Sequence, residues 1–181
     1  ASQMSAEASC SYNESVSLDL QGPLDLDVLN AAVRALIQRH ESLRTVFEST
    51  GTRMLVLKDM DLVPELHDLS SLSEADRSLR MEAIGTQGMG TPFDLAHGPL
   101  LRMMLFRLDE HHHVLRIIAH HIICDGWSMS ILIGDLSRIY TAGGTAEHAM
   151  LPPPVRASRY AQEMNAFYGS AANDRVKGYW K

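Results

Sequence analysis

The sequence predicts an α/β lobe in which one mixed β-sheet packs with helices, and two observations lead to this fold class. Residues 14–22 (ESVSLDLQG) alternate apolar and polar side chains, whereas residues 100–108 (LLRMMLFRL) and 112–120 (HHVLRIIAH) are nearly continuous apolar runs. Alternation is typical of a strand with one solvated face, and a continuous run is typical of a strand buried on both faces. Amphipathic helical segments lie between these strands, and 181 residues that are 45% apolar can bury one sizeable core.

The first half of the chain predicts a strand, a helix and two short strands. Val16, Leu18 and Leu20 share one face of the strand over residues 14–22, and a turn at Gly22-Pro23 follows it. Residues 53–58 (RMLVLK) and 64–70 (PELHDLS) each predict a short strand, with a turn near Gly51 before the first. An amphipathic helix precedes them, with Asp25 as its N-cap and apolar residues at helical spacing: Leu26, Leu29, Val33, Leu36, Ile37, His40 and Leu43.

The second half predicts a helix, a hairpin and a second helix. The first helix begins near Ser73, with Asp76 three residues later as a capping partner, and fades at Gly85, Gly88 and Gly90. A loop over residues 91–99 (TPFDLAHGP) leads to the two apolar strands, which the polar residues DEHH (109–112) join as a hairpin. A helix over residues 128–142 follows, and then a loop and a stiff linker (GGTAEHAM, LPPPV).

Composition excludes several classes of function. The net charge is −6 and no Lys/Arg cluster is present, so we expect no nucleic-acid partner. The longest apolar runs are too short for a membrane-spanning helix, and the first ten residues do not form a signal peptide, so we expect no membrane association. Two cysteines, Cys10 and Cys124, are too few for a disulfide scaffold and favour a cytoplasmic location. Tyr179 and Trp180, in a helical pattern that stops at Lys181, predict a piece of a longer polypeptide.

The stretch AHHIICDGWS, residues 119–128, is the candidate site. Adjacent residues on a strand point to opposite faces, so His120 and His121 are expected to diverge, one inward and the other into a cleft at the strand end. A neutral imidazole can accept a proton near neutral pH. Asp125 lies in the turn, Gly126 leaves space near the backbone, and free N–H groups of the next helix can hold an oxyanion. This combination suits acyl transfer.

Other interpretations of the same stretch remain open at this point. A histidine pair at a strand end is often only a hydrogen-bonded structural pair. A metal site is less favoured, because no CxxC or HExxH spacing occurs and alternation separates His120 from His121. The other histidines, His111, His112 and His113, fall in the polar hairpin turn, where we expect them to be solvated. No GxSxG elbow offers a serine nucleophile, and Cys124 is expected to be a small buried filler.

Several motifs resemble those of one family. HHIICDGWS matches the HHxxxDG signature of the condensation domains of nonribosomal peptide synthetases. RHESLRTVF (residues 39–47), SYNES (11–15), PFDLAHGPLLRMMLFRL (92–108), YAQEM (160–164) and the closing YW resemble further family segments, in the family's order and over nearly the whole chain. The family's first motif, a Gln-containing segment, would lie before Ala1, and its second lobe is not in the sequence.

The resemblance implies a fold, partners and a chemistry. Condensation domains are V-shaped pairs of lobes similar to chloramphenicol acetyltransferase, with the active site in a tunnel between them, and this chain resembles the N-terminal lobe over residues 1–181. The family joins a donor acyl thioester to an acceptor amine, and both substrates arrive on the phosphopantetheine arms of carrier proteins, with no cofactor bound directly. The implied partners are donor and acceptor peptidyl carrier proteins, the C-terminal lobe and the adjacent synthetase domains.

The resemblance also assigns roles to residues of the motif. His121 would face the tunnel and help the acceptor amine attack, as a general base or by positioning, whereas His120 would point inward as a structural residue. Asp125 would hold the shape of the turn by pairing with an arginine: Arg39, Arg44 or one in the second lobe. Gly126 would let the substrate and pantetheine pass close to the backbone.

Three further residues are expected to support the fold. Arg39 and Arg44 are expected to support the fold rather than the chemistry, since an arginine at a helix C-terminus complements the helix dipole. Trp127 is expected to be a packing anchor beside the site.

Two alternatives to peptide-bond formation stay in view. Epimerisation domains share HHxxxDG but need an additional acid in the second lobe. A single lobe that only docks a carrier protein is the other alternative, because half a tunnel cannot orient two substrates. Heterocyclisation domains replace the histidines with aspartates, so AHHIICDG argues against them. We expect the isolated 181-residue chain to be inactive.

Overall fold

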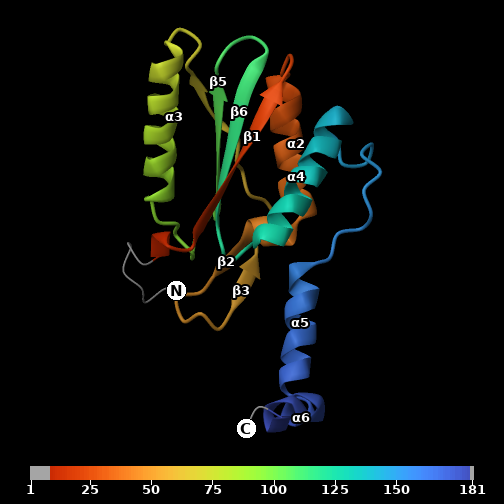
Figure 1. The fold of residues 1–181 in the computed structure, drawn as a ribbon. Coiled ribbons are helices and arrows are strands. Elements are labelled where there is room, and N and C mark those ends of the chain that lie inside the picture. Colours follow the sequence, from red (N-terminus) through yellow and green to blue (C-terminus); the bar gives the residue numbers. More distant parts are fainter. Residues whose placement is uncertain (1–8, 180–181) are drawn as a thin grey trace.

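The computed structural model of the chain describes residues 9–179, so the expectation for Trp180 lies outside the described residues. A four-stranded sheet in the order β1-β6-β5-β4 forms the centre of the fold (Figure 1). Strands β1 (Asn13–Gln21), β6 (His112–His120) and β5 (Leu101–Arg107) are antiparallel, and β4 (Glu65–Asp68) runs parallel to β5. The predicted mixed sheet is confirmed, with both continuous apolar strands at its centre.

Helices cover both faces of this sheet. Helix α3 (Glu74–Met89) lies on one face, whereas α2 (Leu26–Arg39) and α4 (Gly126–Thr141) lie together on the other (Figure 1). Even-numbered residues of β5 and β6, such as Met104 and Ile118, point toward α3, and we call this side the α3 face. Odd-numbered residues, such as Leu115, point toward α2 and α4 and define the α2/α4 face. Strand alternation therefore decides which helix layer each β6 side chain meets.

The glycines of α3 do not end the helix, as the sequence suggested, but lie within it. Gly85 and Gly88 are buried, and α3 continues to Met89 with Gly90 as its C-cap. A Cβ on Gly85 would lie 1.4 Å from Nη1 of Arg116, and one on Gly88 would lie 2.4 Å from Cε of Met104. The two glycines let α3 lie against the sheet, so tertiary packing outweighs their low helix propensity.

The end of α2 also differs from its predicted extent. Asp25 is the predicted N-cap, since its side chain accepts hydrogen bonds from the N–H groups of Asp27 and Val28. The helix ends at Arg39, so His40 is its C-cap, and Leu43 lies in the 3₁₀ helix η1 (Glu41–Arg44). Leu26, at the first position, is exposed. The unpredicted strand β2 (Thr45–Phe47) follows and pairs with β3 (Met54–Val56) in a separate two-stranded sheet.

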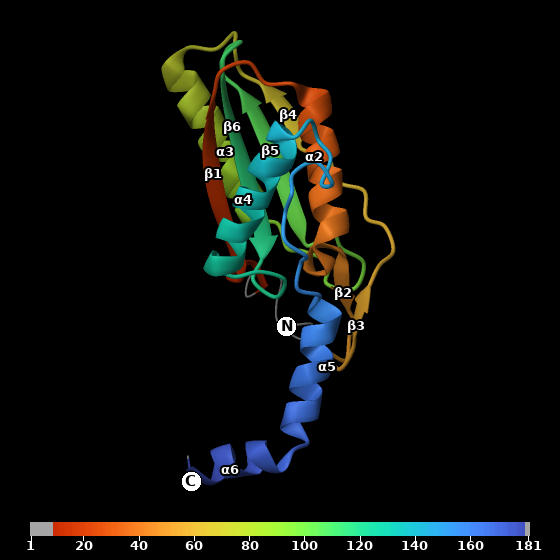
Figure 2. The same ribbon diagram turned by 90° about the vertical axis from the view of Figure 1, so that its right-hand side faces the viewer.

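The last two helices extend away from the sheet. A strap over residues 142–156 leads from α4 to α5 (Ala157–Tyr168), which is followed by α6 (Ala171–Tyr179). Figure 2 shows both helices projecting beyond the rest of the lobe, and α5 has no buried residue. None of the helices in the described part of the chain is both long and apolar enough to cross a membrane.

Candidate active site

The histidine stretch forms a tight connection between the central strand and the N-terminus of α4. Strand β6 ends at His120, and α4 begins at Gly126, two residues earlier than predicted, with Asp125 as its N-cap. The backbone N–H of His121 donates to the carbonyl of Tyr12 at 2.8 Å, and that of Ile123 donates to the carbonyl of His120 at 3.0 Å. These bonds fix the two histidines on opposite sides of the sheet, as alternation predicts.

His120 lies on the α3 face and is 2% exposed. Its ring stacks on Tyr12 at 5.9 Å between centroids, and it meets the edge of Phe93 at 6.3 Å. Its Nδ1 accepts the N–H of Ile122 at 3.1 Å, so in the neutral ring the proton is on Nε2, which has no partner among the described residues. Burial lowers the pKa of His120, because charge is disfavoured away from water, so this ring is neutral at pH 7.

His121 is on the other side of the sheet, with 44% of its side chain exposed. Its Nδ1 lies 2.7 Å from the carbonyl oxygen of Cys124. A carbonyl only accepts, so Nδ1 must donate, and the neutral ring carries its lone pair on Nε2. This hydrogen bond raises the pKa of His121, and the carboxylate of Glu14 raises it further. The ring therefore presents a basic nitrogen whose orientation is set by the backbone.

The carboxylate beside His121 belongs to Glu14 of β1, a residue that the sequence analysis did not single out. Oε1 of Glu14 lies 3.6 Å from Nε2 of His121, and the side chain is 39% exposed. Glu14 is opposite Ala119 in the β1–β6 register, which places it on the α2/α4 face near the end of β6. Only this long-range register brings Glu14 to the site, so no local motif signals it.

Asp125 is bonded to Ser128 and to neither Arg39 nor Arg44, so its pairing with an arginine of the second lobe stays a prediction. Its Oδ1 accepts the backbone N–H of Ser128 at 2.8 Å and the hydroxyl of Ser128 at 2.6 Å. These bonds lower the pKa of Asp125 and keep it ionised at the start of α4. They also occupy the Ser128 N–H, so this donor is not free to hold an oxyanion.

The two candidate arginines of this chain are engaged elsewhere. Nε of Arg39 lies 2.9 Å from Oδ2 of Asp135, and Nε2 of His40 contacts the same oxygen at 2.9 Å, which ties the end of α2 to the middle of α4. Arg39 also donates to the carbonyl of Pro152. Arg44 donates to the carbonyl of Leu57. Both arginines thus join segments of the scaffold, and neither is paired with Asp125.

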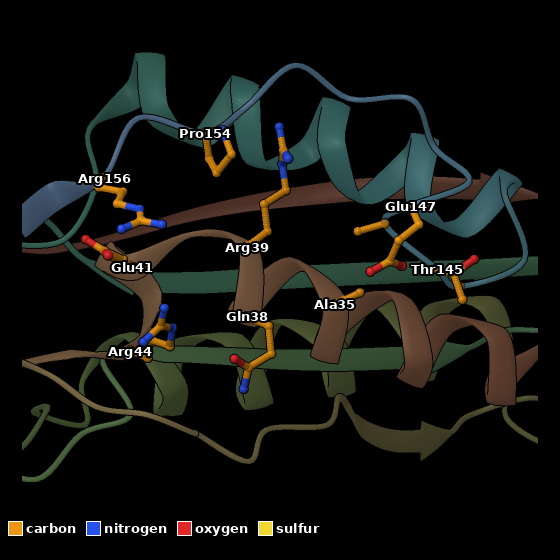
Figure 3. A pocket seen from close by; sticks show the side chains of 11 residues that line it. Ala35, Gln38, Arg39, Glu41, Arg44, Thr145, Glu147, Pro154 and Arg156 are labelled. Carbon is orange, nitrogen blue, oxygen red and sulfur yellow. The ribbon is translucent and has the colours of Figure 1, made fainter.

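A pocket of about 690 Å³ lies beside these arginines rather than at His121. It is open to solvent between α2 and the strap, and Figure 3 shows Arg39 projecting from α2 beneath the strap. Arg44, Glu41 and Arg156 line one end of this pocket, and Glu147 lies toward the other end (Figure 3). Glu41 accepts the N–H and hydroxyl of Ser158, at 3.0 and 2.7 Å, so it anchors the start of α5. The pocket is lined by both acidic and basic side chains, and Arg39 is already bonded to Asp135 and Pro152. We therefore assign this pocket to the scaffold.

The expectation that Trp127 is a packing anchor is wrong, because its side chain is 80% exposed. The buried residues of α4 are Met129, Leu132, Leu136 and Ile139, and Trp127 lies off this face. The space beside Gly126 is open, since a Cβ there would meet no other atom within 4 Å.

The remaining possible ligands do not form a cluster. Cys124 is 6% exposed, and burial raises the pKa of its thiol to about 11, so it is a protonated buried side chain. His113 was expected to be solvated, but it belongs to β6 and is 5% exposed. Within residues 9–179, no three His, Cys, Asp or Glu side chains are grouped closely enough to hold a metal ion.

The fold and the turn together define a class: an α/β lobe whose central strand ends in an HHxxxDG turn that caps a helix. The family model of the condensation domain matches residues 1–181. The chain belongs to this family, the condensation domains of nonribosomal peptide synthetases.

Similar proteins agree with this assignment. The chain is 34% identical over 177 residues to chondramide synthase cmdD of Chondromyces crocatus, and 36% identical over 178 residues to the nonribosomal peptide synthetase agiA of Aspergillus flavus. These matches cover 96% and 90% of this chain but only 4% and 2% of the two large enzymes.

Solved structures support the fold. The starter condensation domain of rhizomide synthetase RzmA has a TM-score of 0.83 at 21% identity, over 95% of this chain and 43% of that one. The SgcC5 protein of Streptomyces globisporus has a TM-score of 0.77 at 28% identity, over 93% of this chain and 39% of that one. The chain thus spans about two fifths of the length of these structures.

Proposed function

We propose that this chain is the N-terminal lobe of a condensation domain that forms a peptide bond between a donor acyl thioester and an acceptor amine. The orientation of His121 carries the proposal: Nδ1–H is held by the Cys124 carbonyl, and Nε2 is left as an exposed base. Similarity over about two fifths of the related structures supports the assignment to one lobe. The active site would then lie between His121 and the second lobe.

In the proposed reaction, His121 transfers one proton from the acceptor amine to the departing sulfur. The acceptor nitrogen attacks the thioester carbonyl carbon, the new C–N bond forms, and the C–S bond breaks. The proton that the nitrogen loses goes to Nε2 of His121 and then to the departing sulfur, so the products are an amide and a free thiol. His120 supports the turn by packing, Asp125 by capping α4, and Gly126 by leaving open the space in which pantetheine would pass.

The proposal includes the setting of the reaction. Both substrates would arrive on phosphopantetheine arms of carrier proteins, within a larger synthetase in the cytoplasm, and the domain itself would bind no cofactor. Because half a tunnel orients neither substrate, we expect the 181-residue chain alone to form no product with two loaded carriers.

The test uses the complete condensation domain with loaded donor and acceptor carriers, and product formation is followed by mass spectrometry. His121→Ala should lower the rate by about 10²- to 10⁴-fold, the usual contribution of general acid–base catalysis. His112→Ala, at the far end of the same strand, is the matched control and should leave the rate unchanged. A rate that His121→Ala does not lower would remove the catalytic role. An epimerised donor in place of a condensed product would identify the alternative within the family.

A further inference from the structure

Glu14 and His121 lie within ion-pair distance of each other but do not form a direct hydrogen bond. Oε1 of Glu14 and Nε2 of His121 are 3.6 Å apart. This separation is too long for a direct hydrogen bond, for which 2.7–3.2 Å is usual. A single nitrogen can, however, lie about 2.9 Å from both atoms and donate one hydrogen bond to each. The gap fits a shared ligand atom.

Both acceptors lie on the same side of the sheet, on side chains that are partly exposed. Glu14 and His121 lie on the α2/α4 side of the β1–β6 pair, and their side chains are 39% and 44% exposed. Nδ1 of His121 is held by the Cys124 carbonyl, so in the neutral ring only Nε2 can accept. With the ring neutral, two acceptors, Oε1 of Glu14 and Nε2 of His121, therefore lie on either side of this gap.

The charges around the gap also favour a positively polarised donor. The ionised groups that act on His121 are the carboxylates of Glu14 and Asp125. Asp125 is occupied by Ser128, whereas among the described residues Glu14 makes no hydrogen bond through its side chain and is free to accept one. An amine nitrogen with two N–H bonds matches this arrangement in charge and in geometry.

We propose that Glu14 binds the acceptor substrate directly, its carboxylate accepting one N–H of a primary amine while Nε2 of His121 accepts the other. The inference rests on the proposed function and adds a specificity to it. The attacking amine must be neutral, and a neutral primary amine has two N–H bonds, whereas a neutral N-alkylated amine has one. Only the primary amine can bridge Glu14 and His121, with its lone pair left for the thioester carbonyl. Glu14 thus selects primary over secondary amine acceptors.

The test compares two acceptors in the complete condensation domain: an aminoacyl carrier with a primary amine, and its N-methyl counterpart. Glu14→Ala should lower kcat/KM for the primary amine by about 10- to 100-fold, the effect of losing one hydrogen bond to a charged group. It should change kcat/KM for the N-methyl acceptor by less than about 3-fold, so the preference for the primary amine collapses. Glu14→Gln, which keeps an acceptor oxygen without the charge, should give an intermediate loss.

Asp19→Asn is the matched control. Asp19 lies at the other end of β1 and contacts Nε2 of His112 at 2.5 Å, so it is also a β1 carboxylate beside a β6 histidine. This variant should keep the selectivity of the wild type. An equal loss for both acceptors in Glu14→Ala would overturn the proposal, because a change in His121 basicity or in folding affects both alike. If His121→Ala remained active, the proposed function itself would fail. If that variant were inactive while Glu14→Ala kept full selectivity, only the role of Glu14 would fail.

Discussion

The two ends of β6 carry nearly the same residues in mirrored arrangements. At the start of the strand, His113 is buried and His112 is half-buried beside Asp19. At its end, His120 is buried and the next residue, His121, is exposed beside a second β1 carboxylate. The faces are exchanged, because His113 and His121 lie on the α2/α4 side while His112 and His120 lie on the α3 side.

The difference lies in the spacing of each pair and in the segment that adjoins the strand. The His112–Asp19 pair is closed at 2.5 Å, whereas the His121–Glu14 pair leaves a gap of 3.6 Å. The hairpin turn precedes His112, whereas a backbone carbonyl orients His121 and the N-terminus of α4 comes after it. The same residue types therefore make a close hydrogen-bonded pair at one end and a wider pair at the other. The comparison shows that residue identity alone does not determine how closely a histidine and a carboxylate pair.

The largest effect on stability is expected at the buried histidine of the HHxxxDG turn. His120→Ala removes the ring that packs against Tyr12 and Phe93 and the acceptor for the Ile122 N–H. We expect the free energy of unfolding to fall by about 2–4 kcal/mol. His112→Ala should leave it nearly unchanged, because that side chain is on the surface. Urea denaturation measures the free energy of unfolding of both variants. Equal losses in the two variants would contradict the distinction between the buried His120 and the surface residue His112.

A smaller effect is expected from the cap that comes after His121. Asp125→Ala removes the acceptor for the Ser128 N–H, and we expect the Tm to fall by about 2–4 °C. Asp25→Ala, which removes the equivalent cap of α2, is the matched control for stability and should lower the Tm by a similar amount. Only the Asp125 variant should also slow condensation, since its turn holds His121. Thermal melting beside kinetics separates the two effects, and an unchanged rate in the Asp125 variant would show that the turn keeps its shape without the cap.

The smallest effect concerns the pH dependence of stability. Its sign is the same for His113 and His120 and opposite for His121. Burial lowers the pKa of His113 and His120, so the unfolded chain binds more protons than the folded one as the pH falls below about 6.5. Their contribution to stability is therefore complete above that pH and decreases below it. The pKa of His121 is raised, so its contribution has the opposite sign and is lost as the pH rises above 6.5. NMR titration should place the midpoint of His121 above 6.5 and the other two below, and a single common midpoint would contradict this.

Local sequence signals predicted much of the fold. Asp25 and Ser73 cap the helices at which they were expected, and the alternation of residues 14–22 and the apolar runs of β5 and β6 gave the correct strands. Alternation also predicted that His120 and His121 diverge. Each of these features depends on neighbours within a few residues, which periodicity and capping rules describe.

Features that depend on distant contacts were missed. Gly85 and Gly88 act as helix breakers in isolation, but the packing of α3 on Arg116 and Met104 keeps them helical. The partner of Arg39 is Asp135, 96 residues away, and Glu14 reaches His121 only through the register of β1 with β6. Trp127 is apolar and near the site, but its position on α4 directs it to solvent. No pattern within one segment encodes these positions.

The length of β6, nine residues, determines on which side of the sheet His120 and His121 lie. Moving one residue along a strand reverses the side to which every later side chain points. Deleting or adding one residue between the hairpin and the turn would hide His121 and expose His120, although the motif itself would read unchanged. We therefore expect chimeras of related domains that are spliced within this strand to work only when the crossover preserves the parity of its length.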